Sequence, residues 1–177
     1  MGAQSEYIIP YLGLSNGIHQ YDFSLNNQFF VNFEKSKIKD ANIELSVNFE
    51  KRDRMVVLEI TGGGSFRSSC DRCLAEIDIP IQFDDRIIIK FADQKHPSDS
   101  EEVYYLDPKT SHVDISPYIY EVVHLHLPIV NARNCEEEGF VYCDQTVLSA
   151  IQTENDKNQS SFEDESPWSE LRKLNLE

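Results

Sequence analysis

Alternating apolar and polar positions dominate the middle of the chain, and they predict β-strands. The clearest run is residues 41–50, in which every second residue from Ile43 to Phe49 is apolar. Residues 77–83 repeat this pattern, and residues 86–91 form a further apolar run. Such alternation is typical of antiparallel strands that face the core on one side and water on the other.

Two other patterns predict a break in the strands and a helix. The glycine run at residues 62–64 predicts a bulge or a loop, because glycine weakens a strand interior. A helix is predicted over residues 116–127, with Ser116 as its N-cap and Pro117 at its first position. Pro128 ends it, because proline cannot continue the hydrogen-bonding pattern.

These elements predict an α+β fold, mainly an antiparallel β barrel or sandwich with one packed helix and a short C-terminal helix. We expect one β-rich globular domain over residues 1–151. Residues 152–166 are polar and acidic, so they are predicted to be a disordered linker. Residues 167–175, with Trp168 and Leu171 on one face, are predicted to form a short docking helix.

The charge of the chain is strongly acidic and unevenly spread. The formal net charge is -15, from 31 acidic and 16 basic residues. Residues 1–90 carry ten basic and thirteen acidic side chains, whereas residues 91–177 carry six and eighteen. Because RNA affinity comes from Lys and Arg that neutralise phosphates, we expect any RNA contact in the first half. The acidic half is better suited to a basic protein.

Three basic clusters lie in that first half. Lys35, Lys37 and Lys39 alternate along the chain, a second cluster falls near residue 52, and two arginines flank the first pair of cysteines. Each cluster alone is typical of a solvated surface. If they converge in space, they would form a phosphate-binding surface that weakens steeply with salt. The candidates for RNA or partner binding are Lys51, Arg52, Arg54, Arg67 and Arg72.

Neither a membrane segment nor an export signal is visible. No window approaches the roughly 18 consecutive apolar residues that a membrane helix needs. The first residues lack the basic and apolar regions of a secretory signal. We therefore expect a cytoplasmic protein with no membrane contact and with reduced cysteines.

Four cysteines are the sharpest chemical signal. Cys70 and Cys73 form a Cys-x-x-Cys pair, which can bind one side of a tetrahedral zinc ion. Cys135 and Cys143 could supply the other two thiolates, although seven residues between paired ligands is an unusual spacing. The alternative is that the first pair are ordinary buried thiols. A redox pair is disfavoured, because it would open a helix rather than join two strands.

Nothing in the sequence predicts catalysis. His124 and His126 are two residues apart, so on a helix they face different directions and cannot hold one ion. No nucleophile elbow, zinc-protease motif or phosphate-binding loop is present. We expect a non-enzymatic protein without a small-molecule substrate.

The succession of motifs resembles one known family. Gly-x-Phe-x-x-x-Cys-x-Arg-Cys-Leu, at residues 64–74, is the most specific piece. It is followed by Tyr104-Tyr105-Leu106, by a Val-Asp-Ile entry to the helix at residues 113–115, and by Leu-x-Leu-Pro at residues 125–128. From residue 7 to residue 174 the chain resembles the YceD-like family of large ribosomal RNA subunit accumulation proteins. The tail at residues 166–174 is similar to that family's closing Asp-Pro-Arg-Trp-x-x-Leu stretch.

The resemblance implies a bacterial or organellar protein needed for accumulation of large-subunit ribosomal RNA. Many family members follow the helix with a segment of four cysteines, where this chain has only Cys135 and Cys143. Two functions follow as expectations. The first is a non-enzymatic ribosome-assembly factor whose partner is ribosomal RNA or a basic ribosomal protein. The alternative is a metal-binding structural adaptor that binds a basic protein without RNA contact.

Overall fold

The computed structural model describes residues 5–92, 103–133, 139, 141–151 and 153. The chain divides into two compact units. The first unit comprises Met1–Ser68 and Asp78–Ile129, and the second comprises Ser69–Ile77 and Val130–Glu177. The first unit contains nearly all of the regular structure, and the second contains the first pair of cysteines.

Five strands form the main sheet, in the order β2-β3-β4-β5-β6. The pairs β2–β3 and β3–β4 are antiparallel, and β5–β6 is parallel. The sheet is therefore mixed, and it is open rather than closed into the predicted barrel. The strands are β2 (Gly17–Leu25), β3 (Ala41–Arg52), β4 (Met55–Ser69), β5 (Glu76–Phe91) and β6 (Val103–Leu106).

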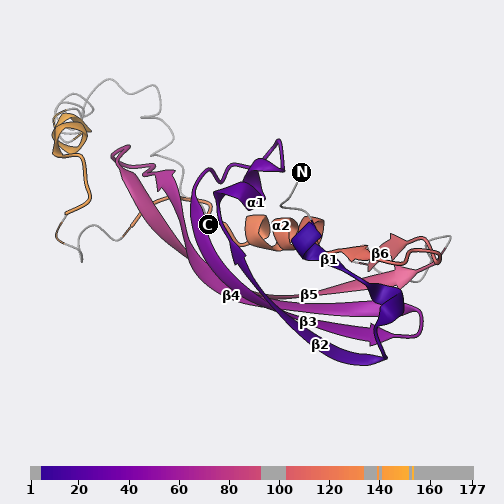
Figure 1. The fold of residues 1–177 in the computed structure, drawn as a ribbon. Helices are drawn as coiled ribbons and strands as arrows, with labels where there is room; N and C mark the ends of the chain where they lie inside the picture. The colour runs from indigo at the N-terminus through magenta and orange to yellow at the C-terminus, as the bar shows by residue number, and fades with distance from the viewer. Residues whose placement is uncertain (1–4, 93–102, 134–138, 140, 152, 154–177) are drawn as a thin grey trace, which may run out of the picture. The chain divides into compact units, whose positions relative to one another are not determined.

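Helices and a small second sheet complete the described elements. β1 (Ile8–Ile9) pairs antiparallel with β7 (Val113–Asp114). Figure 1 shows the helices lying on the concave face of the curved main sheet. Among the described residues, helices rather than the second large sheet of a sandwich cover this face (Figure 1). The helical elements are η1 (Ser5–Tyr7), η2 (Tyr11–Gly13), α1 (Asn27–Val31) and α2 (Ser116–Leu125).

The predicted helix forms with small differences at both ends. α2 starts at Ser116, but the N-cap residue is Ile115 and the capping side chain is that of Asp114. The backbone N–H and the hydroxyl of Ser116 both donate to Asp114 Oδ1, at 2.9 and 2.7 Å. The helix ends at Leu125 rather than residue 127, because a residue that precedes proline is disfavoured in the helical region.

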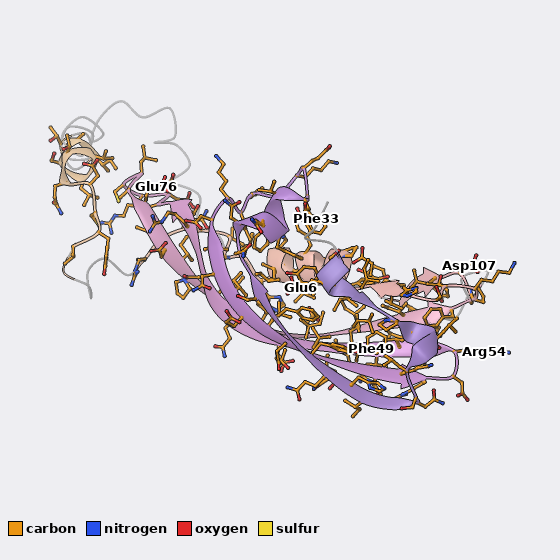
Figure 2. All side chains as sticks on the ribbon, viewed as in Figure 1. Glu6, Phe33, Phe49, Arg54, Glu76 and Asp107 are labelled. Carbon is orange, nitrogen blue, oxygen red and sulfur yellow. The ribbon has the colours of Figure 1, made fainter. Side chains whose placement is uncertain are left out.

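The alternating pattern places the core as predicted. In β3 every second residue from Ala41 to Phe49 is buried, and the residues between them are exposed or half-buried. Phe49 lies on this inward face (Figure 2). Phe29 and Phe30 of α1 are also buried and pack edge to face, with ring centroids 5.0 Å apart. The period-2 pattern is thus sufficient to assign the two faces of the sheet.

The prediction of a break at the glycine run is wrong. β4 continues through residues 62–64 and pairs with β3 from Met55 to Phe66, with Gly64 opposite Ile43. A Cβ on Gly64 would lie 2.1 Å from the backbone oxygen of Asn42, and one on Gly62 would lie 2.6 Å from Leu45 Cβ. Glycine is needed here because the two strands approach too closely for side chains, not because the strand ends.

Two predicted strands are one in the structure. Residues 77–83 and 86–91 belong to β5, which runs from Glu76 to Phe91 without interruption. The polar residues between the two runs do not form a turn, because Asp84 and Arg86 continue the exposed positions of the same alternation.

The C-terminal predictions lie outside the described residues. These are the disordered linker at 152–166 and the docking helix at 167–175. In the part of the chain that is described, no helix is long and apolar enough to cross a membrane.

We expect Gly64→Ala to lower the stability of the fold by about 2–3 kcal/mol, because backbone atoms of β3 cannot yield to the new methyl group. Gly13→Ala is the control, since nothing lies within 4 Å of its added Cβ. Urea unfolding measures both. Equal midpoints for the two variants would contradict the close approach of β3 and β4.

Candidate functional site

Lys51, the first of the predicted RNA-binding residues, is held inside the first unit. Its ammonium donates to the backbone oxygens of Tyr11 and Leu14, at 2.8 and 2.6 Å. It also lies 4.5 Å from the centroid of the Tyr11 ring. The Tyr11 hydroxyl in turn donates to the backbone oxygens of Arg52 and Asp53. Lys51 therefore fixes the N-terminal segment against the β3–β4 hairpin.

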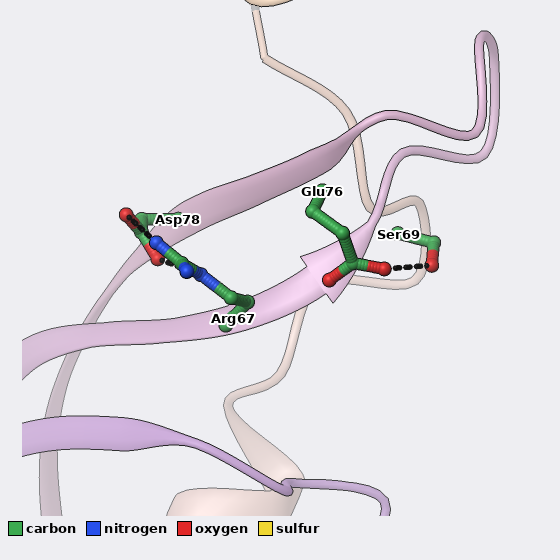
Figure 3. Close-up of polar contacts among 4 residues, drawn as sticks. All are labelled: Arg67, Ser69, Glu76 and Asp78. Atoms are coloured by element: carbon green, nitrogen blue, oxygen red, sulfur yellow. Dashed lines mark hydrogen bonds and ion pairs between the residues drawn. The ribbon is translucent and has the colours of Figure 1, made fainter.

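Two of the predicted arginines are paired with carboxylates. Arg52 donates from Nε and Nη2 to Glu50, at 2.8 Å each. These hydrogen bonds, with the charges of Arg52 and Arg86, lower the pKa of Glu50 although burial opposes the shift. Arg67 makes the same two-pronged contact with Asp78, at 3.0 Å for each bond (Figure 3). Both guanidinium groups would have to exchange a carboxylate for a phosphate.

Two of the predicted arginines lie far apart within the first unit. Arg54 lies at the β3–β4 hairpin (Figure 2), whereas Arg67 lies near the other end of β4. They are thirteen positions apart, which is roughly 40 Å of extended strand at about 3.3 Å per residue. Arg72 is exposed and belongs to the second unit. Within the first unit, the cluster of Lys51, Arg52 and Arg54 therefore lies apart from Arg67, whereas the N–H of Arg67 donates to the oxygen of Asp40, next to Lys39, at 2.9 Å.

A more accessible basic surface is formed by three other lysines, Lys35, Lys37 and Lys39, which are not among the five predicted residues. All three are exposed, and they lie on an ordered loop between α1 and β3. Ile38 between them is buried, and its N–H donates to Ser36 Oγ at 3.2 Å. Because Ile38 points into the core, the lysines on either side of it point to water. Their alternation in the sequence was the signal that could have selected them.

The Cys-x-x-Cys pair lies in a tight loop of the second unit. The N–H of Cys70 donates to the oxygen of Ala75 at 2.8 Å, and the N–H of Leu74 donates to the oxygen of Cys70 at 2.9 Å. Leu74 has a φ of 61°, a left-handed conformation that is uncommon for a leucine. Close to this loop, Ser69 donates to Glu76 at 2.8 Å (Figure 3). Hydrogen bonds within the loop and between the residues that flank it, Ser69 and Glu76, thus hold the turn together.

A second segment of the same unit is fixed to this loop. The N–H of Asp71 donates to the oxygen of Asn131 at 2.8 Å, and the N–H of Asn131 donates to Asp71 Oδ2 at 2.7 Å. Farther along this segment, Arg133 lies over the ring of Tyr142, 4.7 Å from its centroid. These contacts bring the chain around residue 143 toward the cysteine pair.

The side chains of Cys70 and Cys143 both contact the side chain of Cys73. Backbone N–H groups of Ala75 and Asp144 hydrogen-bond to its sulfur and lower the pKa of the Cys73 thiol. Burial opposes this shift, and hydrogen bonds with the Cys70 and Cys143 side chains add to it. Asp144 also caps the helical residues that follow, accepting from Thr146 N–H at 2.9 Å. The surroundings of Cys73 thus favour the thiolate, which is the form that binds metals.

The donor set fits zinc in its chemistry. Three adjacent thiols with amide N–H groups directed at sulfur are typical of a cysteine zinc site. Within the described ranges, however, no three His, Cys, Asp or Glu side chains are arranged as the ligands of one ion. The thiols are therefore adjacent without surrounding a common centre. Cys135, the fourth predicted ligand, lies outside the described residues.

Both histidines of α2 are half-buried and hydrogen-bonded to the protein. His124 contacts the oxygen of Tyr120 through Nδ1 at 2.8 Å and Ser36 Oγ through Nε2 at 3.4 Å. Burial lowers the pKa of His124, and the charge of Lys37 adds to this effect. His126 contacts the oxygen of Val122 at 2.9 Å. Both rings thus have a packing role.

A cavity of about 360 Å³ lies in the first unit, between the sheet and α2. Its lining combines apolar residues with two carboxylates and one arginine, and Tyr104 donates a hydrogen bond to Glu121 within it. Sequence reasoning missed this site because its two carboxylates are 36 positions apart, on a strand and on a helix. Its lining residues are Asp85, Arg86, Ile87, Tyr104, Glu121, Val122 and Leu125.

Comparison with known proteins gives one match. A family model described as large ribosomal RNA subunit accumulation protein YceD matches residues 58–175. The matched region includes β5, α2 and all four cysteines. No curated protein and no solved structure matches the chain.

We expect Lys51→Met to lower the free energy of unfolding by about 1.5–3 kcal/mol, because it removes two hydrogen bonds from a charged donor. Lys35→Met should leave it nearly unchanged, since that side chain is exposed. Urea unfolding of both variants checks this. If Lys51→Met is as stable as the wild type, Lys51 does not fix the hairpin.

Proposed function

The chain belongs to the YceD family of large ribosomal RNA subunit accumulation proteins, and we propose that it supports this accumulation in the cytoplasm by binding a basic ribosomal protein. In this proposal it is a non-enzymatic factor that acts without a small-molecule substrate. The histidines of α2 support this view, because their hydrogen bonds within the protein give them a packing role.

The distribution of charge is the observation that carries the proposal. The net charge is -15, and residues 91–177 carry three acidic residues for each basic one. Lys51, Arg52 and Arg67 are engaged by oxygens of the protein itself. A protein of this kind repels phosphates at long range and attracts the lysine- and arginine-rich proteins of the ribosome.

A second candidate function is direct RNA contact through Lys35, Lys37 and Lys39. Three exposed cations on an anchored loop can follow a phosphate backbone, and the Phe33 and Tyr120 rings stack beside them with centroids 4.1 Å apart. Glu34 and Asp40 flank this segment and oppose such binding. We therefore rank it below the protein partner.

We also propose a structural zinc ion at Cys70, Cys73 and Cys143, with Cys135 as the fourth ligand. The support is the adjacency of the three thiols and the lowered pKa of the Cys73 thiol. Bound zinc would cross-link the two segments that carry these cysteines and so stabilise the second unit.

Affinity purification of the full chain tests the function. We expect large-subunit ribosomal proteins, identified by mass spectrometry, to co-purify and to remain after ribonuclease treatment. Depletion of the protein should lower large-subunit ribosomal RNA relative to small-subunit RNA. Loss of every bound ribosomal protein on ribonuclease treatment would favour direct RNA contact instead.

The RNA candidate has its own test, a salt titration of ribosomal RNA binding. If the lysine loop contacts RNA, changing Lys35, Lys37 and Lys39 to Ser should reduce the salt slope by about 2, at roughly 0.7 per contact with single strands. The control changes Arg52 and Arg67 to Ser and should leave the slope as it is. Equal slopes for all three proteins would remove the lysine loop from consideration.

For zinc, we expect about one equivalent in protein purified without chelator, and less than about a tenth of that in Cys73→Ser. The control is Arg72→Ser, which changes an exposed residue of the same loop and keeps all thiols. Elemental analysis measures the metal. A wild-type content below about a tenth of an equivalent would exclude the zinc proposal.

A further inference from the structure

β5 has one edge that is only partly paired. β4 covers its other edge, and β6 pairs only with residues Ile88–Phe91. No other strand among the described residues lies beside residues 81–87 on this edge. Pro80 is exposed just before this stretch and has no N–H to donate. The open stretch is therefore seven residues, or about 23 Å at roughly 3.3 Å per residue.

This stretch has some but not all of the common protections of a sheet edge. Natural edges carry charged side chains, prolines or bulges that hinder the addition of another strand. Between Ile81 and Ile87 the charges of Asp84, Asp85 and Arg86 give such protection, but there is no proline, and the alternation of buried and exposed side chains is regular. Asp85 is the exception, because it is half-buried and takes an inward position between buried Phe83 and Ile87.

The acidic cavity opens beside the end of this stretch. Asp85, Arg86 and Ile87 form its strand wall, and Tyr104 of β6 is paired with Ile89 just beyond. α2 supplies the opposite wall with Glu121, Val122 and Leu125. Leu125 is 70% exposed, so the wall also presents apolar surface to water. The cavity thus combines aliphatic walls with two carboxylates, and its one basic residue, Arg86, takes an exposed position in the alternation of β5.

The carboxylates are suited to a cation from outside the chain. One oxygen of Asp85 accepts from the N–H of Arg86 at 2.7 Å, and Glu121 accepts from Tyr104. Within the described ranges neither has an ion-pair partner. Burial, Glu121 and neighbouring acidic groups raise the pKa of Tyr104 to about 12, so its hydroxyl stays a donor. A lysine or arginine side chain matches both the aliphatic walls and the acidic groups.

We propose that residues 81–87 of β5 bind an extended, lysine- or arginine-rich segment of a protein as an added strand, with one of its cationic side chains in the cavity formed with α2. Backbone hydrogen bonds between β5 and the added segment fix the register of the new strand pair, and the cavity selects a cationic side chain of that segment. The inference rests on the proposed function, because it names the surface that binds the basic partner. The net charge of -15 favours such a segment over any acidic one.

A synthetic nine-residue peptide of alternating lysine and valine is the probe, titrated into the full chain. We expect Asp85→Asn and Glu121→Gln each to weaken its binding about tenfold, since each removes one charge-assisted contact. Asp84→Asn is the matched control, because this neighbouring residue carries the same charge on the exposed face of β5. It should change binding less than about twofold. The peptide should also slow hydrogen exchange in residues 81–87.

Two further peptides separate strand addition from charge attraction. N-methylation of alternate backbone amides should abolish binding, and replacing lysine by glutamate should do the same. Equal binding by Asp84→Asn and Asp85→Asn, or binding that survives N-methylation, would overturn the proposal. Self-association of the Asp85→Asn variant in sedimentation would also overturn the proposal. That result would mean that the charge of Asp85 serves only to prevent two copies of the chain from pairing through this edge.

The affinity purification distinguishes this inference from the proposed function. If Asp85→Asn retains the same ribonuclease-resistant ribosomal proteins as the wild type, the edge is not the site and the function stands. If the wild type retains none, the function itself fails. Thermal unfolding of Asp85→Asn confirms that the variant is folded before either result is interpreted.

Discussion

The close approach of β3 and β4 at the glycine run is the constraint on which the rest of the first unit depends. Gly64 leaves room for the backbone oxygen of Asn42, which a Cβ would meet at 2.1 Å. Because of this approach β4 stays paired with β3 from Met55 to Phe66. An uninterrupted β4 can then carry β5 beside it, and β5 forms one wall of the acidic cavity.

Local patterns in the sequence predicted the faces and ends of elements better than their connections. The alternation in β3 and the Pro-marked start of α2 were sufficient, because burial and capping act over a few residues. The glycine run was misread, because its role depends on atoms of another strand. The open sheet could not be predicted either, since alternation shows that one face is covered but not what covers it.

The candidate site was likewise predictable only where a residue's role does not depend on distant parts of the chain. Adjacent cations such as Lys51 and Arg52 looked equivalent in the sequence, yet one binds backbone oxygens and the other binds Glu50. The cysteines were predictable, because few residue types support a metal site and their spacing is visible. In the structure, the side chains of Cys70 and Cys143 hydrogen-bond with that of Cys73. The acidic cavity was not predictable, since Asp85 and Glu121 are brought together only by the packing of α2 on the sheet.

The contact between the N-terminal segment and the β3–β4 hairpin has a consequence for synthesis on the ribosome. Tyr11 and Leu14 are translated early, but their partner Lys51 follows about forty residues later. At about 5–20 residues per second, the segment waits for seconds before its partner exists. During that interval Tyr11 has neither its hydrogen bonds nor the ring of Phe91, 4.2 Å away in the folded protein. The first part of the chain to be made is thus fixed only after the strands of the β3–β4 hairpin have been made.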